Sequence, residues 1–347
     1  MSEKTIFVTG GCGFIGSNFI INQIKHTDNS IINLDKLTYA GNEDNLKDID
    51  SSNRYTFIKG DINTKKIVDN IFSEFHPDAI INFAAESHVD RSIDGPMEFV
   101  HSNIVGTANL LESSRRYYDL NQKDNFRFIH VSTDEVYGSL GDEGFFSEET
   151  PYSPTSPYSA SKASSDHLVN AWHHTFNLPT IITNCSNNYG PYQFPEKLIP
   201  LMIMNCLEGK DLPVYGKGEN VRDWLFVTDH CDAIYEVYLN GRTGHTYNIG
   251  GNNEIENIQI VNSICEIMDN QRPLDNDKSY KDLIKFVEDR PGHDFRYAID
   301  ASKIKNELKW LPKEDFQTGI QKTIDWYLNN KDWYENIKYK QERLGVL

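Results

Sequence analysis

The first half of the chain alternates short apolar runs with segments whose apolar residues recur at helical spacing. The apolar runs predict strands at Thr5–Thr9, Ile31–Asp35, Tyr55–Lys59, Ala79–Phe83, Phe126–Val131 and Thr180–Asn184. Apolar residues repeating every three or four positions predict helices at Phe14–Lys25, Lys65–Phe75, Met97–Tyr117 and Tyr158–Phe176. Strands that alternate with helices are typical of a parallel sheet covered on both faces, so we predict an α/β fold of the doubly wound Rossmann type.

The alternation ends near residue 185 and gives way to loops rich in Asn and Pro. We expect a Rossmann domain at 1–185, joined again by residues from about 222 to 250, and a smaller mixed α/β substrate lobe at 186–347. The polar segment Asn270–Lys281 is expected to be a surface excursion. Asp300–Leu308 and Phe316–Leu328 predict closing helices, whereas Lys331–Leu347 gives no clear pattern.

Composition narrows the possible partners. The 347 residues include 34 basic and 51 acidic side chains, and the formal net charge of -17 repels nucleic-acid phosphates. No apolar run approaches the roughly 20 residues that a membrane span needs, so no membrane partner is expected. Because no charged-then-apolar leader precedes the first strand, we expect a cytoplasmic protein without a signal peptide. Five scattered cysteines without C-x-x-C spacing favour reduced thiols, and no metal is expected.

A glycine-rich turn joins the first predicted strand to the first helix. Thr9–Gly16 fits both G-x-G-x-x-G and G-x-x-G-x-x-G, in which glycines let the backbone approach a pyrophosphate at a helix N-terminus. Asp35 ends the next strand about 20 residues further on, where a carboxylate binds adenosine ribose hydroxyls. This acid should repel a 2′-phosphate, so we predict NAD over NADP. Lys36 is a complication, because its charge could partly relieve that repulsion.

Two pairs of residues carry candidate chemistry. Tyr158 and Lys162 lie four positions apart, hence on one helical face, and a neighbouring ammonium favours the phenolate form of a tyrosine whose ordinary pKa is about 10. Asp134 and Glu135 follow the apolar run that ends at Val131. Alone, the first pair would be an exposed helical pair and the second a solvated loop. Their presence with a dinucleotide-binding turn favours a catalytic role.

With these motifs together, the sequence resembles the extended short-chain dehydrogenase/reductase family over nearly its whole length, and within it the dTDP-glucose 4,6-dehydratases. The glycine turn and the Tyr-x-x-x-Lys pair are similar to the family at large. The strings that resemble the dehydratases are 35–41, 84–92, 132–138 and 290–294. Related sugar epimerases typically lack the Asp-Glu pair after the threonine, so this pair separates functions that share one fold.

The resemblance implies an NAD-dependent hydro-lyase that converts dTDP-glucose into its 4-keto-6-deoxy derivative for deoxysugar, rhamnose-type synthesis. Tyr158, assisted by Lys162, would remove the C4 hydroxyl proton while hydride leaves C4 for NAD+, and Thr133 would hydrogen-bond the C4 oxygen. Glu135 would then take the C5 proton and protonated Asp134 would donate to the departing C6 hydroxyl, after which hydride returns to C6. Close carboxylates in a poorly solvated pocket separate their protonation states in the way this requires.

Spacing and resemblance together assign residues to the two ligands. Expected cofactor-binding residues are Gly10, Cys12, Gly13, Phe14, Ile15, Gly16, Asp35, Lys36, Leu37, Thr38, Asp61, Ile62, Phe83, Ala84, Ala85, Ser87, Asn103, Tyr158, Lys162 and Asn188. Expected substrate-binding residues are Ser87, Thr133, Asn187, Glu196, Lys197, Leu198, Pro213, Tyr215, Arg222, Asn257, Arg290, His293 and Tyr297. The arginines suit a diphosphate because a guanidinium holds phosphate in a bidentate way.

Assembly and substrate leave alternatives open. The helices predicted at Met97–Tyr117 and Tyr158–Phe176 carry more apolar residues than one sheet face needs, and the resemblance implies a homodimer through a four-helix contact, although ordinary core would look the same. The alternative functions are a UDP-glucose 4,6-dehydratase, a nucleotide-sugar 4-epimerase and a non-catalytic NAD-binding regulator. The sequence does not decide between thymine and uracil, which differ by one methyl group.

Overall fold

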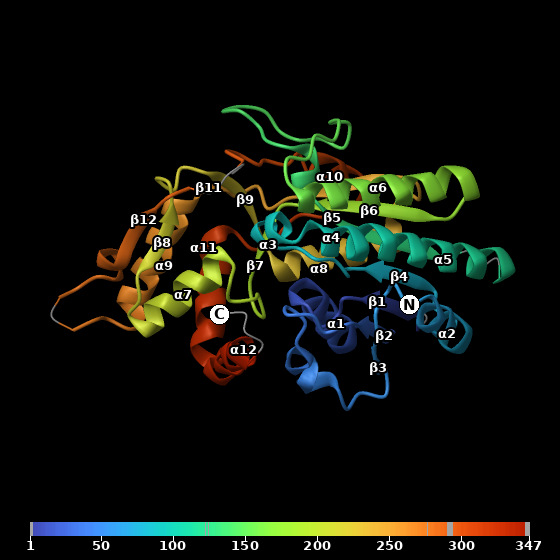
Figure 1. The fold of residues 1–347 in the computed structure, drawn as a ribbon, viewed down its shortest axis with the longest axis horizontal. Helices are drawn as coiled ribbons and strands as arrows, with labels where there is room; N and C mark the ends of the chain where they lie inside the picture. Colours follow the sequence, from blue (N-terminus) through green and yellow to red (C-terminus); the bar gives the residue numbers. More distant parts are fainter. Residues whose placement is uncertain (1–2, 122, 124, 276, 290–293, 344–347) are drawn as a thin grey trace.

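The computed structural model describes residues 3–121, 123, 125–275, 277–289 and 294–343. Figure 1 shows a large sheet flanked by helices and, beside it, a smaller group of helices and short strands formed mainly by the second half of the chain. No helix of the described ranges is long and apolar enough to cross a membrane.

Seven parallel strands form the main sheet, in the order β10-β6-β5-β4-β1-β2-β3. The strands are β1 (Thr5–Thr9), β2 (Ser30–Asp35), β3 (Tyr55–Lys59), β4 (Ala79–Asn82), β5 (Arg127–Thr133), β6 (Thr180–Cys185) and β10 (Thr246–Ile249). The chain runs from β1 outward to β3 on one side and then returns to β4 on the other, so the strand order reverses between β1 and β4. This confirms the predicted doubly wound α/β fold.

Successive strand residues pack against two different helix layers. On β1, the fully buried Ile6 and Val8 belong to one core, whereas Phe7 between them belongs to another on the opposite face. Since side chains alternate across a strand, a continuous apolar run fills both faces of the sheet. The first face is covered by α1 (Phe14–His26) and α8 (Val227–Asn240), the second by α2 (Lys65–Phe75), α5 (Thr107–Asn121) and α6 (Pro157–Phe176).

Two predictions in this half were wrong in detail. The segment Met97–Tyr117 is not one α-helix; after α3 (Val89–Asp94) it is divided among the elements α4 (Pro96–Phe99), the π-helical η2 (Val100–Gly106) and α5. The wide π turn lets Asn103 bond the Glu86 backbone, a tertiary contact that helical periodicity does not report. β5 also continues past its predicted end at Val131, because Thr133 still pairs with Cys185 of β6.

The remaining elements follow β6 along the chain. They are β7 (Asn187–Tyr189), α7 (Leu198–Glu208), β8 (Leu212–Tyr215), β9 (Val221–Phe226), β11 (Glu254–Glu256), α9 (Asn257–Gln271), η4 (Tyr280–Leu283), β12 (Ile284–Val287), α10 (Ser302–Leu308), α11 (Phe316–Asn329) and α12 (Lys331–Arg343). The strands among them form two small sheets, with the orders β11-β9-β7 and β12-β8. A separate apolar core joins α7, α9 and α11. The predicted closing helices thus match α10 and α11 to within two residues.

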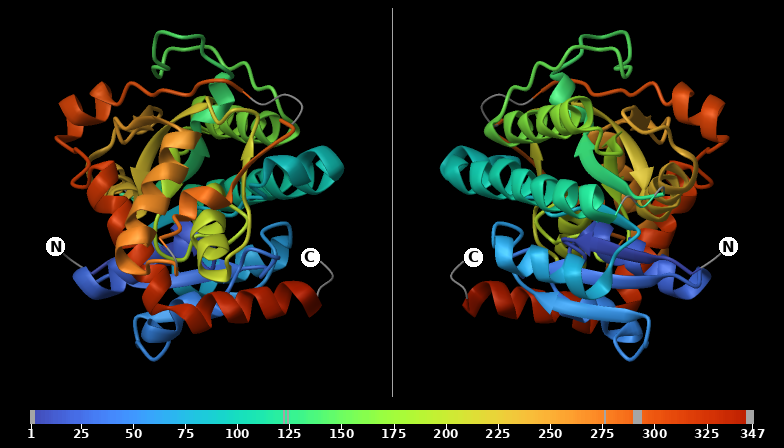
Figure 2. Two further views of the ribbon diagram at one scale, coloured as in Figure 1. Left: turned by 90° about the vertical axis from the view of Figure 1, so that its left-hand side faces the viewer. Right: turned by 90° about the vertical axis from the view of Figure 1, so that its right-hand side faces the viewer.

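Polar composition misled the prediction at two places. The segment Asn270–Lys281 is not only a surface excursion, because Tyr280 is buried and its hydroxyl donates to the Arg272 carbonyl at 2.9 Å. The C-terminal segment, which gave no clear pattern, contains α12, and Figure 2 shows it lying beside the N-terminal segments. Trp333 of α12 donates from Nε1 to Asn45 Oδ1 of η1 (Glu43–Ile49) at 2.7 Å. Trp333 therefore links α12, a helix that is polar overall, to η1.

Candidate functional site

A cavity of about 310 Å³ lies along the carboxyl ends of the parallel strands, where the strand order reverses. Its wall is built by the segments that follow β1, β2, β3, β4, β5 and β6. In a doubly wound sheet the helices and loops diverge at this reversal and leave a crevice for ligands. The fold therefore brings residues from both halves of the chain to one place.

The cavity collects most of the predicted site residues. Those in its wall are Gly10, Gly13, Phe14, Ile15, Gly16, Asp35, Lys36, Thr38, Asp61, Ile62, Phe83, Ala84, Ala85, Ser87, Thr133, Asp134, Glu135, Tyr158, Lys162, Asn187, Asn188, Glu196 and Lys197. Those placed elsewhere are Cys12, Leu37, Asn103, Leu198, Pro213, Tyr215, Arg222, Asn257 and Tyr297. Arg290 and His293 lie outside the described residues.

The turn after β1 forms a close backbone cradle. Gly10 has φ +69°, and a Cβ atom there would lie 2.7 Å from the Ala84 backbone. A Cβ atom at Gly16 would lie 2.4 Å from the Gly10 carbonyl oxygen. The N-cap of α1 is Gly13, and it provides no side-chain cap for the first amides of that helix. Amides open toward the cavity at a helix N-terminus suit a pyrophosphate, so this cradle fits the dinucleotide predicted from the sequence.

Asp35 stands at the end of β2 with its carboxylate fixed by the backbone. Its Oδ2 accepts from Cys12 N at 2.8 Å and its Oδ1 accepts from Leu37 N at 2.7 Å. Burial raises the pKa of Asp35, and these two N–H donors oppose that rise by favouring the charged form. Lys36 does not turn its charge to Asp35; its Nζ pairs with Asp61 Oδ2 at 2.9 Å. The positive charge of Lys36, which could have relieved the repulsion between Asp35 and a 2′-phosphate, is therefore largely compensated by Asp61.

The start of α6 positions the Tyr-x-x-x-Lys pair. Ser156 caps the helix in a reciprocal capping box with Ser159, and Pro157 occupies the first turn. This cap places Tyr158 in the first turn, at the cavity, and Lys162 one turn further in. Both side chains are buried, and Lys162 Nζ donates to the Val131 carbonyl of β5 at 2.8 Å. The ammonium is thus held against the strand that also carries Thr133.

The titration of Tyr158 differs from the sequence expectation. Burial raises the pKa of its phenol well above the ordinary value, and the Glu135 carboxylate adds to the rise. A hydrogen bond with Thr133 acts in the opposite direction without reversing the balance. The expected stabilisation of the phenolate by Lys162 therefore does not dominate in the protein alone, because desolvation of the anion is the larger effect.

The carboxylates occupy a single turn, η3 (Asp134–Tyr137), directly after β5. Thr133 Oγ1 accepts from Glu135 N at 3.3 Å, which caps this turn, and donates to Asp134 Oδ1 at 3.2 Å. Asp134 is only 1% exposed, and its Oδ2 is buried with no hydrogen-bond partner among the described residues. Burial, then the charges of Glu135 and Asp223, raise the pKa of Asp134 well above its ordinary value. The surroundings of Asp134 in the cavity wall therefore favour its neutral form.

The opposite wall is held by a contact among three segments. Glu196 accepts from the Tyr39 hydroxyl at 3.0 Å, and its other oxygen lies 3.5 Å from Arg91 Nη2. The Arg91 guanidinium stacks over the Tyr39 ring at 3.7 Å from its centroid. Asn187 Oδ1 is buried with no partner among the described residues and belongs to the same cavity. These groups offer polar contacts to a sugar hydroxyl or amide.

Arg222 is not in the cavity wall. Its guanidinium donates to the Val221 and Asp294 carbonyls, each at 2.8 Å, and stacks over the Tyr297 ring at 4.4 Å. These contacts join Arg222 to the segment around Asp294. Tyr215 on β8 lies outside the cavity as well and is 45% exposed.

Some cavity residues carry no earlier assignment. These are Leu34, Tyr39, Ala40, Gly41, Gly60, Glu86, Ser102, Val131, Ser132, Cys185, Ser186, Gln193 and Phe194. Tyr39 and Ser132 lie within strings that already resembled the dehydratases, so that resemblance could have identified them. Cys185 and Phe194 belong to no motif, and only the folding of β6 and its following loop brings them to the site. No cluster of His, Cys, Asp or Glu in the described ranges could hold a metal ion.

The comparisons with known proteins agree with this geometry. The family described as GDP-mannose 4,6 dehydratase matches residues 7–323. A relative from Escherichia coli named dTDP-glucose 4,6-dehydratase is 56% identical over 360 residues, covering 99% of this chain and 99% of the relative.

Two solved structures with the same name resemble the whole fold. The one from Bacillus anthracis, described as a complex with NAD, has a TM-score of 0.85 and 47% identity, and covers 96% of this chain and 99% of that chain. The one from Streptomyces venezuelae, described with NAD and TYD bound, has a TM-score of 0.88 and 43% identity over the same shares.

Proposed function

This chain belongs to the dTDP-glucose 4,6-dehydratases of the extended short-chain dehydrogenase/reductase family, and we propose that its cavity carries out their reaction with the residues named below. It is an NAD-dependent hydro-lyase whose substrate is dTDP-glucose and whose product is dTDP-4-keto-6-deoxy-glucose. We place it in deoxysugar synthesis of the rhamnose type, in the cytoplasm.

One observation carries the assignment of roles: a buried carboxyl with a raised pKa stands directly beside a second carboxylate on one turn. Elimination of water requires an acid for the leaving oxygen and a base for the neighbouring carbon acid. Asp134 meets the first need, because burial keeps it protonated, and Glu135 faces the same cavity. A simple dehydrogenase or a binding module has no use for this pair.

The chain's own residues divide the reaction into three tasks. The glycine turn after β1 and Asp35 would hold NAD, which would supply a reversible hydride acceptor for the oxidation at C4 and the reduction at C6. In its phenolate form, which burial disfavours in the protein alone and the neighbouring ammonium of Lys162 favours, Tyr158 takes the proton of the C4 hydroxyl, and Thr133 holds the C4 oxygen. Glu135 removes the C5 proton, which the neighbouring ketone has made acidic. Asp134 gives its proton to the C6 oxygen, which leaves as water, and Glu135 returns its proton to C5 when C6 receives hydride.

The cofactor is expected to be NAD rather than NADP. Asp35 presents a carboxylate where a 2′-phosphate would lie, and Lys36 is engaged by Asp61 at 2.9 Å. We therefore expect at least about tenfold tighter binding of NAD in a calorimetric titration, which corresponds to about 1.4 kcal/mol. Lys36→Ala should change the ratio of the two dissociation constants by less than about threefold, since its charge is already paired. Equal affinities for the two cofactors would contradict this preference.

We assign the dinucleotide to residues 1–185 with a return at about 222–250, and the nucleotide sugar to 186–347. The pairing of β10 with β6 and the packing of α8 on the main sheet support the return. The roles of Arg222, Asn257, Arg290, His293 and Tyr297 in holding the diphosphate and base remain part of this proposal.

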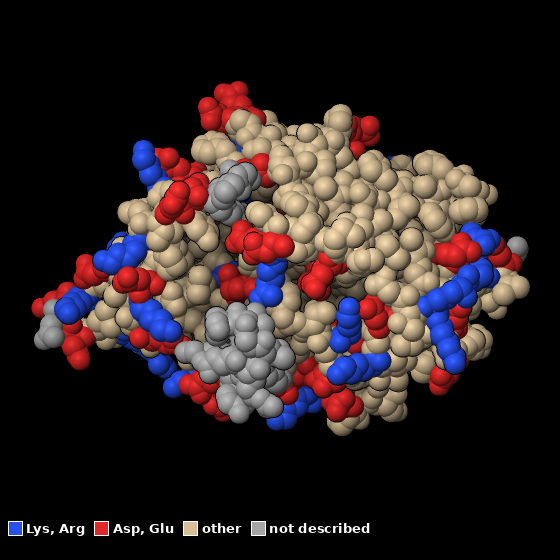
Figure 3. All heavy atoms as spheres, viewed as in Figure 1, with Lys and Arg blue, Asp and Glu red and all other residues tan. Residues whose placement is uncertain are grey.

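We also propose a homodimer through α5 and α6. Met97 is 59% exposed and Val105 47% exposed, both in the segments that lead into α5. Figure 3 shows few charged side chains over α5 and α6, apart from a group at the outer end of α5. A second copy that covers this apolar, weakly charged face would complete a four-helix contact.

Incubation with dTDP-glucose and with UDP-glucose tests the function. The expected product from dTDP-glucose has lost the mass of one water and carries a C4 ketone. Faster loss of water from UDP-glucose than from dTDP-glucose would support a UDP-glucose 4,6-dehydratase instead. A product of unchanged mass would indicate a 4-epimerase. Binding of NAD without any product from either sugar would favour the non-catalytic regulator.

A further inference from the structure

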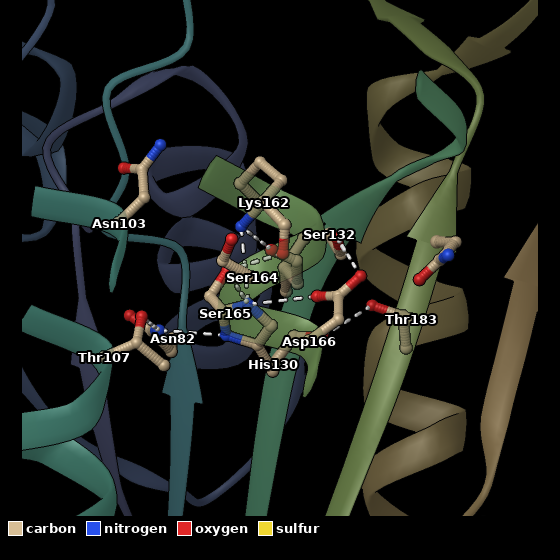
Figure 4. Close-up of polar contacts among 12 residues, drawn as sticks. Asn82, Asn103, Thr107, His130, Ser132, Lys162, Ser164, Ser165, Asp166 and Thr183 are labelled. Atoms are coloured by element: carbon tan, nitrogen blue, oxygen red, sulfur yellow. Dashed lines mark hydrogen bonds and ion pairs between the residues drawn. The ribbon is translucent and has the colours of Figure 1, made fainter. Parts of the chain in front are cut away.

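Behind the Tyr158–Lys162 pair lies a buried polar network that the proposed chemistry does not use (Figure 4). Asp166 of α6 is 0% exposed and its Oδ2 accepts from Ser132 Oγ at 2.8 Å. His130 of β5 is 1% exposed and lies between the side chains of Lys162 and Asp166. Ionising a fully buried carboxyl group costs free energy unless an opposite charge lies nearby, so an ionised Asp166 requires a partner among its neighbours.

The protonation of His130 follows from its neighbours. Thr9 Oγ1 donates to Asn82 Oδ1 at 2.6 Å, and the amide nitrogen of Asn82 therefore points toward His130. Asn82 Nδ2 then faces His130 Nδ1 at 3.0 Å, so Nδ1 is the acceptor and the ring proton lies on Nε2. His130 Nε2 faces Ser165 Oγ at 3.2 Å and Asp166 Oδ1 at 3.4 Å, both of which can accept this proton.

His130 therefore cannot serve as the partner of Lys162. Lys162 Nζ lies 3.5 Å from His130 Nε2, but both atoms carry protons, so no hydrogen bond joins them. Burial and, next, the charge of Lys162 together lower the pKa of His130 to about 4, so the imidazole is neutral near pH 7. Lys162 donates to the Val131 carbonyl, which satisfies one proton but provides no opposite charge.

We propose that Asp166 is the counter-ion of Lys162, a positioning residue that keeps the buried ammonium charged from one helical turn away, with neutral His130 between them. Positions 162 and 166 share one face of α6. Asp166 accepts a hydrogen bond from Ser132 Oγ at one oxygen, and its other oxygen lies 3.4 Å from His130 Nε2, so two donors face this carboxyl group. The inference rests on the proposed function for its catalytic meaning, because Lys162 assists Tyr158 there.

The other titratable groups around the pair are neutral. The thiol of Cys185 on β6 lies near Lys162, and the hydroxyls of Tyr137 and Tyr152 lie near Asp166. Burial raises the pKa of all three groups, which favours their neutral forms. Burial lowers the pKa of Lys162, and Asp166 is the first group that opposes this effect. Removal of the Asp166 charge should consequently let Lys162 lose its proton at lower pH.

The test measures the ionisation of Lys162 directly. In the full-length protein labelled with 13C-lysine, the ε-carbon signal of Lys162 is assigned by its absence from Lys162→Met and followed from pH 6 to 11. In Asp166→Asn we expect the titration midpoint to fall by at least about one pH unit. Ser165→Ala is the matched control, because it removes a neighbouring hydrogen bond of the same network without removing a charge; its midpoint should stay within about 0.3 units of wild type.

The pH profile of turnover provides the second readout. The alkaline limb of kcat for dTDP-glucose should move to lower pH in Asp166→Asn by about the same shift as the Lys162 signal. An unchanged Lys162 midpoint in a folded Asp166→Asn protein would overturn the counter-ion proposal. If that variant does not fold, wild-type protein decides: an ammonium signal at pH 8 supports the proposal, and a neutral amine there overturns it. Lack of turnover in wild type would instead overturn the proposed function, since the NMR titration needs no catalysis.

Discussion

At the scale of single residues, two adjacent carboxyls acquire different properties from different surroundings. Asp134 is buried at the end of β5, so its neutral form is favoured, whereas Glu135 is only partly buried at the cavity. Because Asp134 and Glu135 are adjacent in the sequence, both lie at the site. Their different burial favours the neutral form of Asp134, which suits an acid, and leaves Glu135 as the base. The same separation gives two testable predictions.

Glu135→Gln should reduce formation of the 4-keto-6-deoxy product by at least about 100-fold, because it removes the base for the C5 proton. Oxidation at C4 should persist, since Thr133, Tyr158 and Lys162 are unchanged. Deuterium incorporation at C5 in heavy water, measured by mass spectrometry, should be suppressed. Glu143→Gln, at an exposed position in the following loop, is the control and should behave like wild type. Normal C5 exchange in Glu135→Gln would remove Glu135 from this role.

Asp134→Asn should change stability as well as activity. The pKa of Asp134 is raised in the folded protein, so its stabilising contribution is complete below the unfolded-state pKa and is lost as pH rises toward the folded-state pKa. An asparagine does not titrate. The Tm of Asp134→Asn minus that of wild type should therefore increase from pH 4 to pH 8 by at least about 2 °C, the shift that about 1 kcal/mol gives in a large domain.

Calorimetric scans of the free protein measure this difference, with Asp142→Asn, an exposed neighbour, as control. A difference that stays constant with pH would show that Asp134 does not titrate abnormally. In the same variant, C5 exchange should survive better than loss of the C6 hydroxyl, because the base is intact and the acid is missing.

At the scale of elements, short caps and turns position the reactive groups. The capping box at Ser156 sets where α6 begins, and hence the depth of Tyr158 and Lys162 in the cavity. The pattern of the sequence located this helix to within one residue. It did not locate α12, which depends on contacts with distant residues.

The link between α12 and η1 should be measurable. Trp333 donates to Asn45, whose amide donates to the Cys12 carbonyl in the cofactor turn at 3.0 Å. A double-mutant cycle of Trp333→Phe and Asn45→Ala, analysed by urea unfolding, should give a coupling free energy of about 1 kcal/mol. Additive effects of the two substitutions would show that the hydrogen bond contributes nothing to stability.

At the scale of the whole molecule, the site exists because one sheet reverses its strand order. The turn after β1, the acid after β2 and the reactive residues after β5 are far apart in sequence and meet only at that edge.

The proposed dimer gives a prediction at this scale. Val105→Asp should convert a dimer into a monomer at micromolar concentration, because a charge would be buried without a partner in an apolar contact. Light scattering after size-exclusion chromatography measures the mass. Leu311→Asp, at a residue 50% exposed in the connection between α10 and α11, should leave the dimer intact. A monomeric wild-type protein would refute the proposed assembly.

The sequence by itself determined the doubly wound fold, the glycine cradle, the acid at the end of β2 and the Tyr158–Lys162 pair. These features are local: periodicity, capping and glycine conformation act within a few residues. The tertiary structure alone decided that Arg222 contacts carbonyls instead of the cavity, that Lys36 pairs with Asp61, and that burial raises the pKa of both Asp134 and Tyr158. Burial and electrostatic interaction depend on which distant segments pack together, and spacing along the chain does not contain that information.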